Sequence, residues 1–392
     1  MTFKHMHSVA PTCSVSRAGL LTGQYPFQCN MFDLAHRGGS LNDYSKHLIH
    51  TLKPAGYQTA LIGFQHLVNW PQVDRLGYDQ VLGQNGAHGC KIAPLAVDWL
   101  TQHSHDAKPF FLSVGLTQTH RVFPDDIPES DARYLRPPAP FPDTDAFRQD
   151  MAAYVASLEA ADTALGQILD ALEVNGLKDN TLIICTTDHG LPFPTMKNNL
   201  TDHGTGVLFI LAGPGIPQGE VTDALLSQID VYPTLCDYLN IDAPHWLEGE
   251  SFLPVIQGQA DQVHEHIITQ SNYHAGKYHP YRCIRTTRYV YIQGYQDNEY
   301  SACPKSDASL SEAQWLDQGW GDDLGPKERL FDTFFDPHER VNLAGHQAYE
   351  SIKKSLKNQL HTQLTGLEDP ILEGALPSQW ALVQASADLK TS

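Results

Sequence analysis

Two short apolar runs constrain the fold of this chain more than any other feature of its sequence. They are residues 109–116 (PFFLSVGL) and 181–187 (TLIICTT). Near-continuous runs of this kind are typical of strands that are buried on both faces. Such strands occur in parallel sheets that carry helices on each side. The chain is therefore expected to fold around a covered, largely parallel sheet.

Strand and helix patterns alternate along the chain to about residue 255, which is typical of an α/β fold. Further strands are expected over residues 3–10, 57–63 and 207–211. Apolar spacing predicts helices over residues 14–21, 40–55, 93–102 and 151–172, and again from residue 227. The segment 125–145 is rich in proline and acidic side chains, so a loop is expected there.

The character of the sequence changes after residue 260. Short runs with aromatic residues predict an antiparallel sheet, and a helix pattern follows it; these segments are 266–269, 281–286, 289–293 and 348–365. We therefore predict a larger domain over residues 1–260 and a smaller C-terminal α+β subdomain over residues 261–392.

Composition excludes some classes of partner. The 392 residues carry a formal net charge of −19, whereas a nucleic-acid surface needs a basic stripe. The seven cysteines are odd in number and lack a C-x-x-C spacing, so neither a disulfide framework nor a structural zinc site is indicated. No run has the length of a membrane-spanning helix, and residues 1–12 lack the apolar core of a signal peptide.

The stretch from Cys13 to Gly23 places a thiol, hydroxyls and a guanidinium close together. If residues 14–21 form a helix, Cys13 lies at its N-terminus, where free N–H groups favour anions. Arg17 is one turn further on and shares a face with Cys13. The arrangement suits a tetrahedral oxyanion such as sulfate or phosphate. The alternative is that Cys13 is a small buried hydrophobic residue.

Polar residues follow three expected strands. His66 comes after 57–63, His120 after 109–116, and Asp188 with His189 directly after 181–187; Lys197 lies a little beyond. Open α/β sheets bind ligands at the carboxyl ends of their strands. Each residue alone is compatible with a structural role or a turn. Together they supply metal ligands, cations for an oxyanion and imidazoles for proton transfer.

These residues belong to longer motifs. The motifs are residues 10–17 (APTCSVSR) with 21–23 (LTG), 109–112 with His120 and Arg121, 187–194 (TDHGLPFP), 230–234 (DVYPT), 330–332 (LFD), 336–339 (DPHE) and 342–344 (NLA). With them the chain resembles the sulfatases of the alkaline phosphatase-like superfamily, most closely the sulfamidases of the heparan N-sulfatase type. The resemblance implies an alkaline phosphatase-like fold, with residues 1–260 as the catalytic domain.

The resemblance also implies roles for the site residues. Cys13 would be oxidised to formylglycine by a formylglycine-generating enzyme, and Arg17 would stabilise its hydrate. Asp188 and His189, with the Cys13 side chain, would bind a divalent metal. Calcium is the expected ion, as is usual in the family; because His189 stands where common members have asparagine, a softer metal such as manganese is the alternative. Lys197, His66 and His120 would hold sulfate oxygens or protonate the leaving group.

Three departures from the family pattern stand out. Sulfatases open with a strand that ends in paired metal-binding aspartates, whereas residues 3–12 match the segment just before the cysteine. We therefore expect that the chain starts too far downstream, is a fragment, or is a degenerate member. Val15 occupies a position where the family has proline or alanine, and Phe64 one where it commonly has lysine.

The leading hypothesis is hydrolysis of a sulfate ester or N-sulfate of a sulfated sugar. Alternatives are a phosphonate or phosphate-ester hydrolase of the same superfamily, or a non-catalytic relative that binds sulfated glycans. The expected partners are a sulfated carbohydrate and the modifying enzyme, without a membrane span; a homo-oligomer is left open. A periplasmic or secreted location would follow if a signal peptide preceded residue 1, and a cytoplasmic one otherwise.

Overall fold

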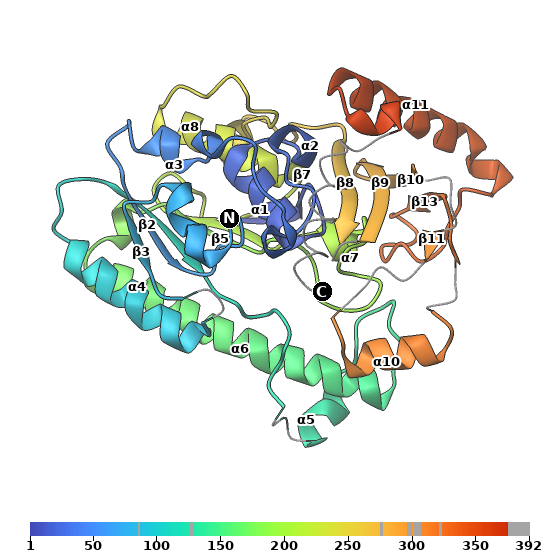
Figure 1. The fold of residues 1–392 in the computed structure, drawn as a ribbon, viewed down its shortest axis with the longest axis horizontal. Coiled ribbons are helices and arrows are strands. Elements are labelled where there is room, and N and C mark those ends of the chain that lie inside the picture. Colours follow the sequence, from blue (N-terminus) through green and yellow to red (C-terminus); the bar gives the residue numbers. More distant parts are fainter. Residues whose placement is uncertain are drawn as a thin grey trace, which may run out of the picture.

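The computed structural model describes residues 1–374 except 85–86, 126, 128, 275–276, 296–299, 302–306 and 321–323. It contains two sheets in its N-terminal part and a separate antiparallel sheet in its C-terminal part (Figure 1). The expected combination of a largely parallel region and an antiparallel region is confirmed. No helix of the described residues is long and apolar enough to cross a bilayer.

The N-terminal sheets are built from the strands that the apolar runs predicted. One sheet has the order β3 (Gln80–Leu82), β2 (Gln58–Gly63) and β4 (Phe110–Gly115), all parallel. The other has the order β5 (Ile183–Thr186), β6 (Phe209–Ala212), β1 (Thr2–His7) and β7 (Val221–Ser227). In it β1 and β7 are parallel, and β6 runs antiparallel to both β1 and β5.

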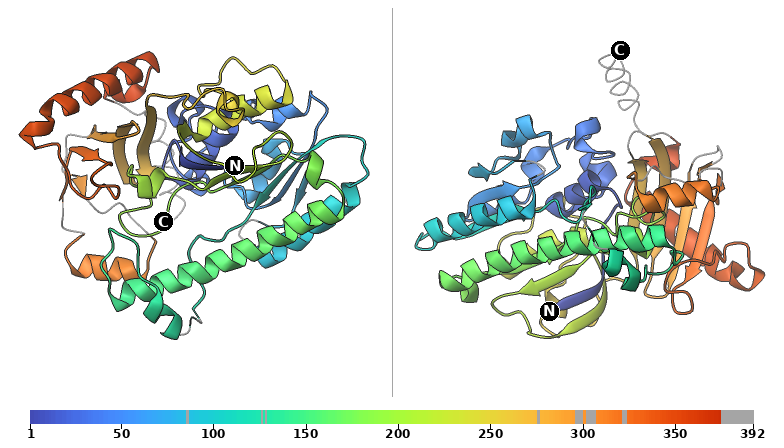
Figure 2. Two further views of the ribbon diagram at one scale, coloured as in Figure 1. Left: turned by 180° about the vertical axis from the view of Figure 1, so that it is seen from behind. Right: turned by 90° about the horizontal axis from the view of Figure 1, so that it is seen from below.

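Helices cover both faces of these sheets. The long helix α6 (Asp145–Val174) lies beside α4 (Gly89–His103) on one face (Figures 1 and 2). Their apolar sides share a buried cluster with residues of β2. On the other face lie α1 (Cys13–Thr22), α3 (Ile49–Leu52) and α8 (Val231–Leu239). Side chains of α3 and α8 pack in one cluster with residues of β1, β6 and β7.

The C-terminal sheet has the order β13 (Glu328–Asp332), β10 (Tyr289–Gly294), β9 (Lys277–Arg285) and β8 (Ile267–His274), all antiparallel. Helix α11 (Glu350–Gly366) packs on it through Leu356, Leu360 and Leu364. The domain division at residue 260 stays a prediction. The shorter elements are α2 (Pro26–Cys29), α5 (Glu129–Tyr134), α7 (Asp202–Thr205), α9 (Leu253–Ile256), α10 (Leu310–Asp317), β11 (Tyr300–Ser301) and β12 (Leu324–Gly325).

The predicted helix over residues 40–55 is wrong. The structure has a 3₁₀ turn at Tyr44–Lys46 and the one-turn helix α3. Between them His47 is extended, and its Nδ1 accepts a hydrogen bond from the N–H of Ile49 at 3.2 Å. Local side-chain bonds of this kind compete with a continuous helix. The apolar spacing reflects real burial, because Leu48 and Leu52 are both buried, but Leu48 precedes α3 and Leu52 is its last residue.

Two further expectations need correction. The segment 125–145, expected to be loop, contains the six-residue helix α5. Strands β4 and β5, expected to be buried on both faces, are only half-buried along their whole length. The reason is their position, because each is the edge strand of its sheet.

The C-terminal part is held by a fully buried ion pair. Arg282 of β9 donates through Nε and Nη2 to the carboxylate of Asp369, at 2.5 and 3.0 Å, and neither side chain is exposed. Removing one partner of a buried pair leaves an uncompensated charge.

We expect Arg282→Met to lower the free energy of unfolding by about 3–5 kcal/mol in urea denaturation. Lys178→Ala, which breaks an exposed pair with Glu173, is the control and should have no measurable effect.

Candidate active site

The site is built on the N-terminus of α1. Strand β1 leads through an extended Thr12 into the helix, whose first residue is Cys13. The helix ends at Gly23, which adopts φ 67°, a left-handed conformation that suits glycine. The expected helix and its stop are both confirmed. Cys13 is 3% exposed and lines the large cavity beside the sheet.

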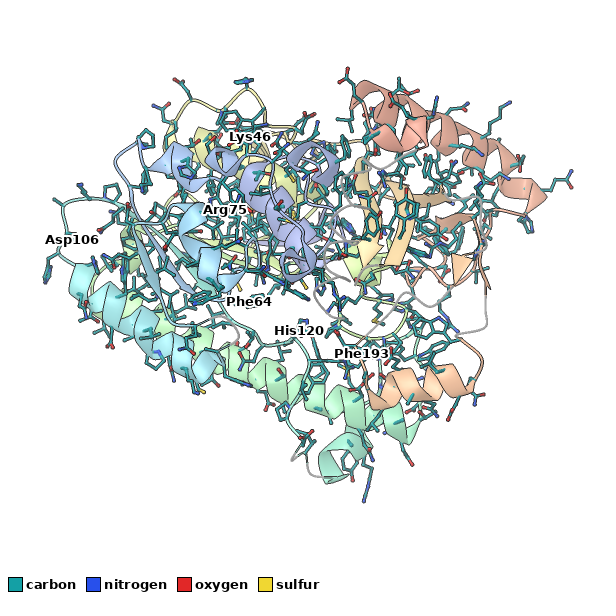
Figure 3. The ribbon with its side chains drawn as sticks, viewed as in Figure 1. Lys46, Phe64, Arg75, Asp106, His120 and Phe193 are labelled. Atoms are coloured by element: carbon teal, nitrogen blue, oxygen red, sulfur yellow. The ribbon has the colours of Figure 1, made fainter. Side chains whose placement is uncertain are left out.

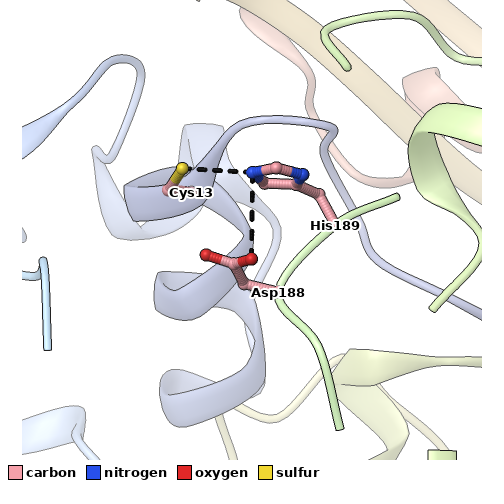
Figure 4. Close-up of side chains that lie close together, drawn as sticks. All are labelled: Cys13, Asp188 and His189. Carbon is pink, nitrogen blue, oxygen red and sulfur yellow. Dashed lines mark hydrogen bonds and ion pairs between the residues drawn. The ribbon is translucent and has the colours of Figure 1, made fainter. Parts of the chain in front are cut away.

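Cys13 meets the two residues that follow β5 (Figure 4). Its Sγ lies 3.1 Å from Nε2 of His189, and this Nε2 lies 3.8 Å from Oδ1 of Asp188. The three side chains offer ligand atoms that all lie within 4.8 Å of one another. Cys13 and Asp188 are 175 positions apart in the sequence, and the sheet brings them together because β1 and β5 run in the same direction.

Arg17 completes this side of the site. Its Nε donates to Oδ2 of Asp188 at 2.9 Å, and its guanidinium lies 4.9 Å from the centre of the Phe64 ring. Burial opposes the charged form of Asp188, but Arg17 and His189 outweigh it and lower the pKa of that carboxyl. Asp188 is therefore held as a carboxylate that points toward His189 and Cys13.

Lys197 and His120 form the opposite side. Nζ of Lys197 lies 3.1 Å from Nε2 of His120 and 2.8 Å from a carboxylate oxygen of Asp307. Lys197 is 4% exposed. Burial disfavours its charge, but Cys13 and Asp307 more than compensate and raise its pKa. The site therefore contains a buried cation whose charge is balanced on one side by Asp307.

His120 is fixed by its neighbour Arg121. The Arg121 guanidinium makes two bonds of 2.6 Å to the carboxylate of Asp150 on α6, and its Nε donates to the carbonyl of Pro192 at 2.9 Å. The Arg121 guanidinium also lies over the rings of Phe123 and Phe193. Figure 3 labels His120 near the middle of α6 and Phe193 nearer the N-terminal part of that helix. The His120 segment is thus tied both to a helix and to the segment after Asp188.

The electrostatics of the site converge on Cys13. Burial opposes ionisation of its thiol, but His189, Lys197 and His120 together hold the pKa of Cys13 well below its usual value. Burial disfavours protonated His189, but Asp188 and Cys13 raise its pKa to about 9. The position therefore stabilises negative charge, whichever atom carries that charge.

His66 lies in the same cavity but is held differently. It adopts φ 72°, an uncommon conformation for a residue other than glycine, and its carbonyl accepts a 2.6 Å bond from Ser14. Its ring stacks on His36, with Nε2 3.0 Å from Nδ1 of His36. Strain of this kind persists where the surroundings over-determine a conformation, often at functional sites.

Two site residues were missed in the sequence. His36 lies in the short 3₁₀ helix Ala35–Arg37, and its only signal was the high histidine content of the chain. Asp307 belongs to the C-terminal part and gave no signal, because nothing local links it to Lys197.

Two of the three departures from the family pattern, Val15 and Phe64, have structural roles. Val15 is 3% exposed and belongs to an apolar cluster with Ala10 and Ala18. Phe64 provides the ring on which the Arg17 guanidinium rests. At position 64 the chain therefore has no additional cation, and the aromatic ring instead supports Arg17.

Comparison with known proteins gives the family. A sulfatase family model matches residues 1–241, and a model of the C-terminal part of N-sulphoglucosamine sulphohydrolase matches residues 200–306. The chain belongs to the sulfatase family, a family of sulfuric ester hydrolases. It is 25% identical to human N-sulphoglucosamine sulphohydrolase, covering 94% of this chain and 84% of the relative. It is 28% identical to an ulvan-active sulfatase of Formosa agariphila, covering 95% and 74%.

Solved structures support the same fold. The yidJ protein of Bacteroides fragilis superimposes with a TM-score of 0.76 at 21% identity, covering 95% of this chain and 89% of that one. A protein solved with D-glucosamine-2-N,6-O-disulfate gives a TM-score of 0.72 at 19% identity, covering 94% and 92%. The alkaline phosphatase-like fold expected from the sequence is confirmed.

The environment of Cys13 leads to a prediction for the unmodified protein. We expect its thiol to ionise at a lower pH than the buried thiols of Cys29 and Cys283, for which burial raises the pKa to about 11. The measurement is the ultraviolet absorbance of thiolate as a function of pH, compared with that of Cys13→Ala. The variant should lack the titration step at lowest pH. A step that survives the substitution would contradict the prediction.

Proposed function

We propose that this chain hydrolyses a sulfate ester or an N-sulfate of a sulfated sugar, with a nucleophile derived from Cys13. The single observation that carries the proposal is the convergence of His189, Lys197 and His120 on the side chain of Cys13. A buried site with several cationic groups around one nucleophilic position is suited to charge that develops on a sulfuryl group.

The nucleophile in this proposal is formylglycine, formed by oxidation of Cys13. Its hydrate carries two hydroxyl groups on one carbon. One oxygen attacks sulfur, the S–O or S–N bond to the sugar breaks, and a sulfate ester of the hydrate results. Loss of the proton from the second hydroxyl then re-forms the aldehyde and expels sulfate. A thiol has no second hydroxyl and cannot follow this route.

The surrounding side chains have distinct proposed roles. Lys197 is a buried cation that can bind sulfate oxygens, and its link to Asp307 keeps its position fixed. His120, 3.1 Å from Lys197, is the proposed donor of a proton to the leaving oxygen or nitrogen. Hydrogen bonding to Cys13 raises the pKa of His120 despite its burial, which favours the protonated form. His66 is the proposed contact for the sulfate or the adjacent sugar.

A divalent cation is the proposed cofactor. Asp188 and His189 offer an oxygen and a nitrogen ligand, and the modified side chain at position 13 would offer oxygen in place of sulfur. This donor set fits a divalent metal, and Arg17 keeps Asp188 charged for it. When bound, the metal polarises the sulfuryl group. Calcium is the usual ion of the family, and the imidazole of His189 favours manganese.

The sugar substrate is proposed from the relatives. The human protein is named for N-sulphoglucosamine, and one solved neighbour holds a glucosamine disulfate. The cationic side chains around Cys13 are consistent with such an anionic ligand. The proposal also includes a formylglycine-generating enzyme as the partner that modifies Cys13. It further includes a periplasmic or secreted location if a signal peptide precedes residue 1, and a cytoplasmic one otherwise.

Turnover of three substrates tests the proposal. We expect the protein, expressed with a formylglycine-generating enzyme, to hydrolyse an aryl sulfate or N-sulfoglucosamine and not a phenylphosphonate ester. Cys13→Ala and Asp188→Ala should each lower kcat/KM by at least about a thousandfold, because they remove the nucleophile and a ligand. Cys90→Ala changes an exposed cysteine outside the site and should be silent.

Other outcomes identify the alternatives. Preferred turnover of the phosphonate ester would indicate the related phosphonate hydrolase activity. If mass spectrometry shows that Cys13 keeps its sulfur and no metal copurifies, the chain is a non-catalytic relative. Full activity in Cys13→Ala or Asp188→Ala would refute the assignment of the site.

Metal content tests the proposed ligands separately. After incubation with equal calcium and manganese, we expect the protein to retain one of the two ions, and elemental mass spectrometry measures their ratio. His189→Asn should shift the ratio toward calcium by about tenfold or more, because an oxygen ligand replaces a softer nitrogen. Asp307→Asn, which alters a site carboxylate outside the ligand set, is the control. Unchanged metal content in both Asp188→Ala and His189→Asn would contradict the assignment.

A further inference from the structure

Strands β4 and β5 are edge strands that face one cavity. Among the described residues β4 pairs only with β2, and β5 pairs only with β6. Residues 108–119 and 181–188, which contain the two strands, both line a cavity of about 2230 Å³. Each strand therefore turns a row of unpaired backbone N–H and C=O groups toward the same space.

Helices close this cavity on both faces. One wall comes from α6, through residues that include Leu158, Leu165 and Leu169. The opposite wall comes from α1, α3 and α8, through residues that include Leu20, Leu52 and Leu235. The two walls are the same helix layers that cover the neighbouring sheets. The cavity thus has the layered surroundings of a sheet interior.

The directions of the bordering strands agree. Strand β5 is antiparallel to β6, and β6 is antiparallel to β1, so β5 and β1 run in the same direction. Strand β2 is parallel to β4. The segments after β1, β4 and β5 supply Cys13, His120 and Asp188, which meet at one site. One strand lying between β4 and β5 could therefore be parallel to both.

The sequences of the bordering strands fit an interior position better than an edge. Residues 109–116 and 181–187 have apolar side chains for both faces, as strands covered by helices do. Natural edge strands are usually short, charged or covered. In this protein β4 and β5 are half-buried. Leu158 of α6, which lines the cavity beside them, is 47% exposed. The apolar surface and the unpaired backbone thus coincide.

We propose that this cavity is a strand-binding slot for one extended apolar peptide segment of about six residues, which pairs with β4 and β5 in parallel. The six residues of β4 set the length. A lipid chain or a sugar lacks the alternating N–H and C=O groups that both edges require. A folded second copy of the chain would bring a strand already paired in its own sheet, whereas the slot needs a strand free on both edges.

Hydrogen exchange tests the slot directly and does not depend on sulfatase activity. The probe is a soluble peptide with about six consecutive isoleucine, valine and leucine residues between terminal lysines. We expect it to slow amide exchange in residues 110–115 and 183–186 by about tenfold or more, and to raise Tm by about 3 °C. Exchange in residues 281–285 of β9 should not change, because this strand is paired on both sides.

A matched peptide separates strand pairing from apolar adsorption. The control peptide has proline in the middle of the apolar run, which removes an N–H donor and disrupts a central strand. It should neither slow exchange nor raise Tm. Equal protection by both peptides, or protection by neither, would overturn the proposal. It would also be overturned if β4 and β5 were already protected in the free protein and this protection disappeared on dilution with dissociation of a dimer.

Two variants of α6 test the location. Leu158→Asp places a charge in the wall of the slot and should weaken binding of the apolar peptide by about tenfold or more. Val174→Asp makes the same change on the same helix at a residue that is 85% exposed and does not line the cavity, and binding should be unchanged. Both positions are solvent-accessible enough for the variants to fold. Unchanged binding in Leu158→Asp would place the peptide elsewhere.

Discussion

The chemistry of this protein depends on the shared direction of its strands. Because β1 and β5 run the same way, the first residue of α1 and the two residues after β5 meet at one edge of the sheet. The segment after β4 joins them there through His120. Reversing one of these strands would move its polar end to the far side of the molecule. The contact between Cys13 and His189 is thus a consequence of topology.

Charge balance is the second constraint, because the site is buried. Lys197, Asp188 and His189 would each be unfavourable alone, and each is held by an opposite charge within reach. Arg17 neutralises Asp188, while Asp307 neutralises part of Lys197. What remains is positive potential around Cys13, which lowers the pKa of its thiol and suits an oxyanion equally well. The paired charges keep the buried site stable, and the remaining positive potential around Cys13 still attracts a sulfuryl group.

Local patterns explain why much of this could be predicted from the sequence. Apolar runs and helical spacing located β2, β4, β5 and α6, and the polar residues directly after strands identified His120, Asp188 and His189. Interactions over long sequence distances could not be predicted. Asp307 reaches Lys197 from 110 residues away, and His36 stacks on His66 from 30 residues away. The half-buried state of β4 and β5 also depends on neighbours that no local window contains.

The strand-binding slot and the site share their supports. The segment after β4 positions His120, and the segment after β5 positions Asp188 and His189, on the two sides of the cavity. A strand paired with both would fix their separation through backbone hydrogen bonds. Catalytic groups must be held to a fraction of an ångström, and rigid elements achieve this better than loops. In the structure Arg121, which follows His120, links the segment after β4 to α6 through Asp150 and to the segment after β5 through Pro192. Occupation of the slot would therefore act on the geometry around Cys13 without any contact with the substrate.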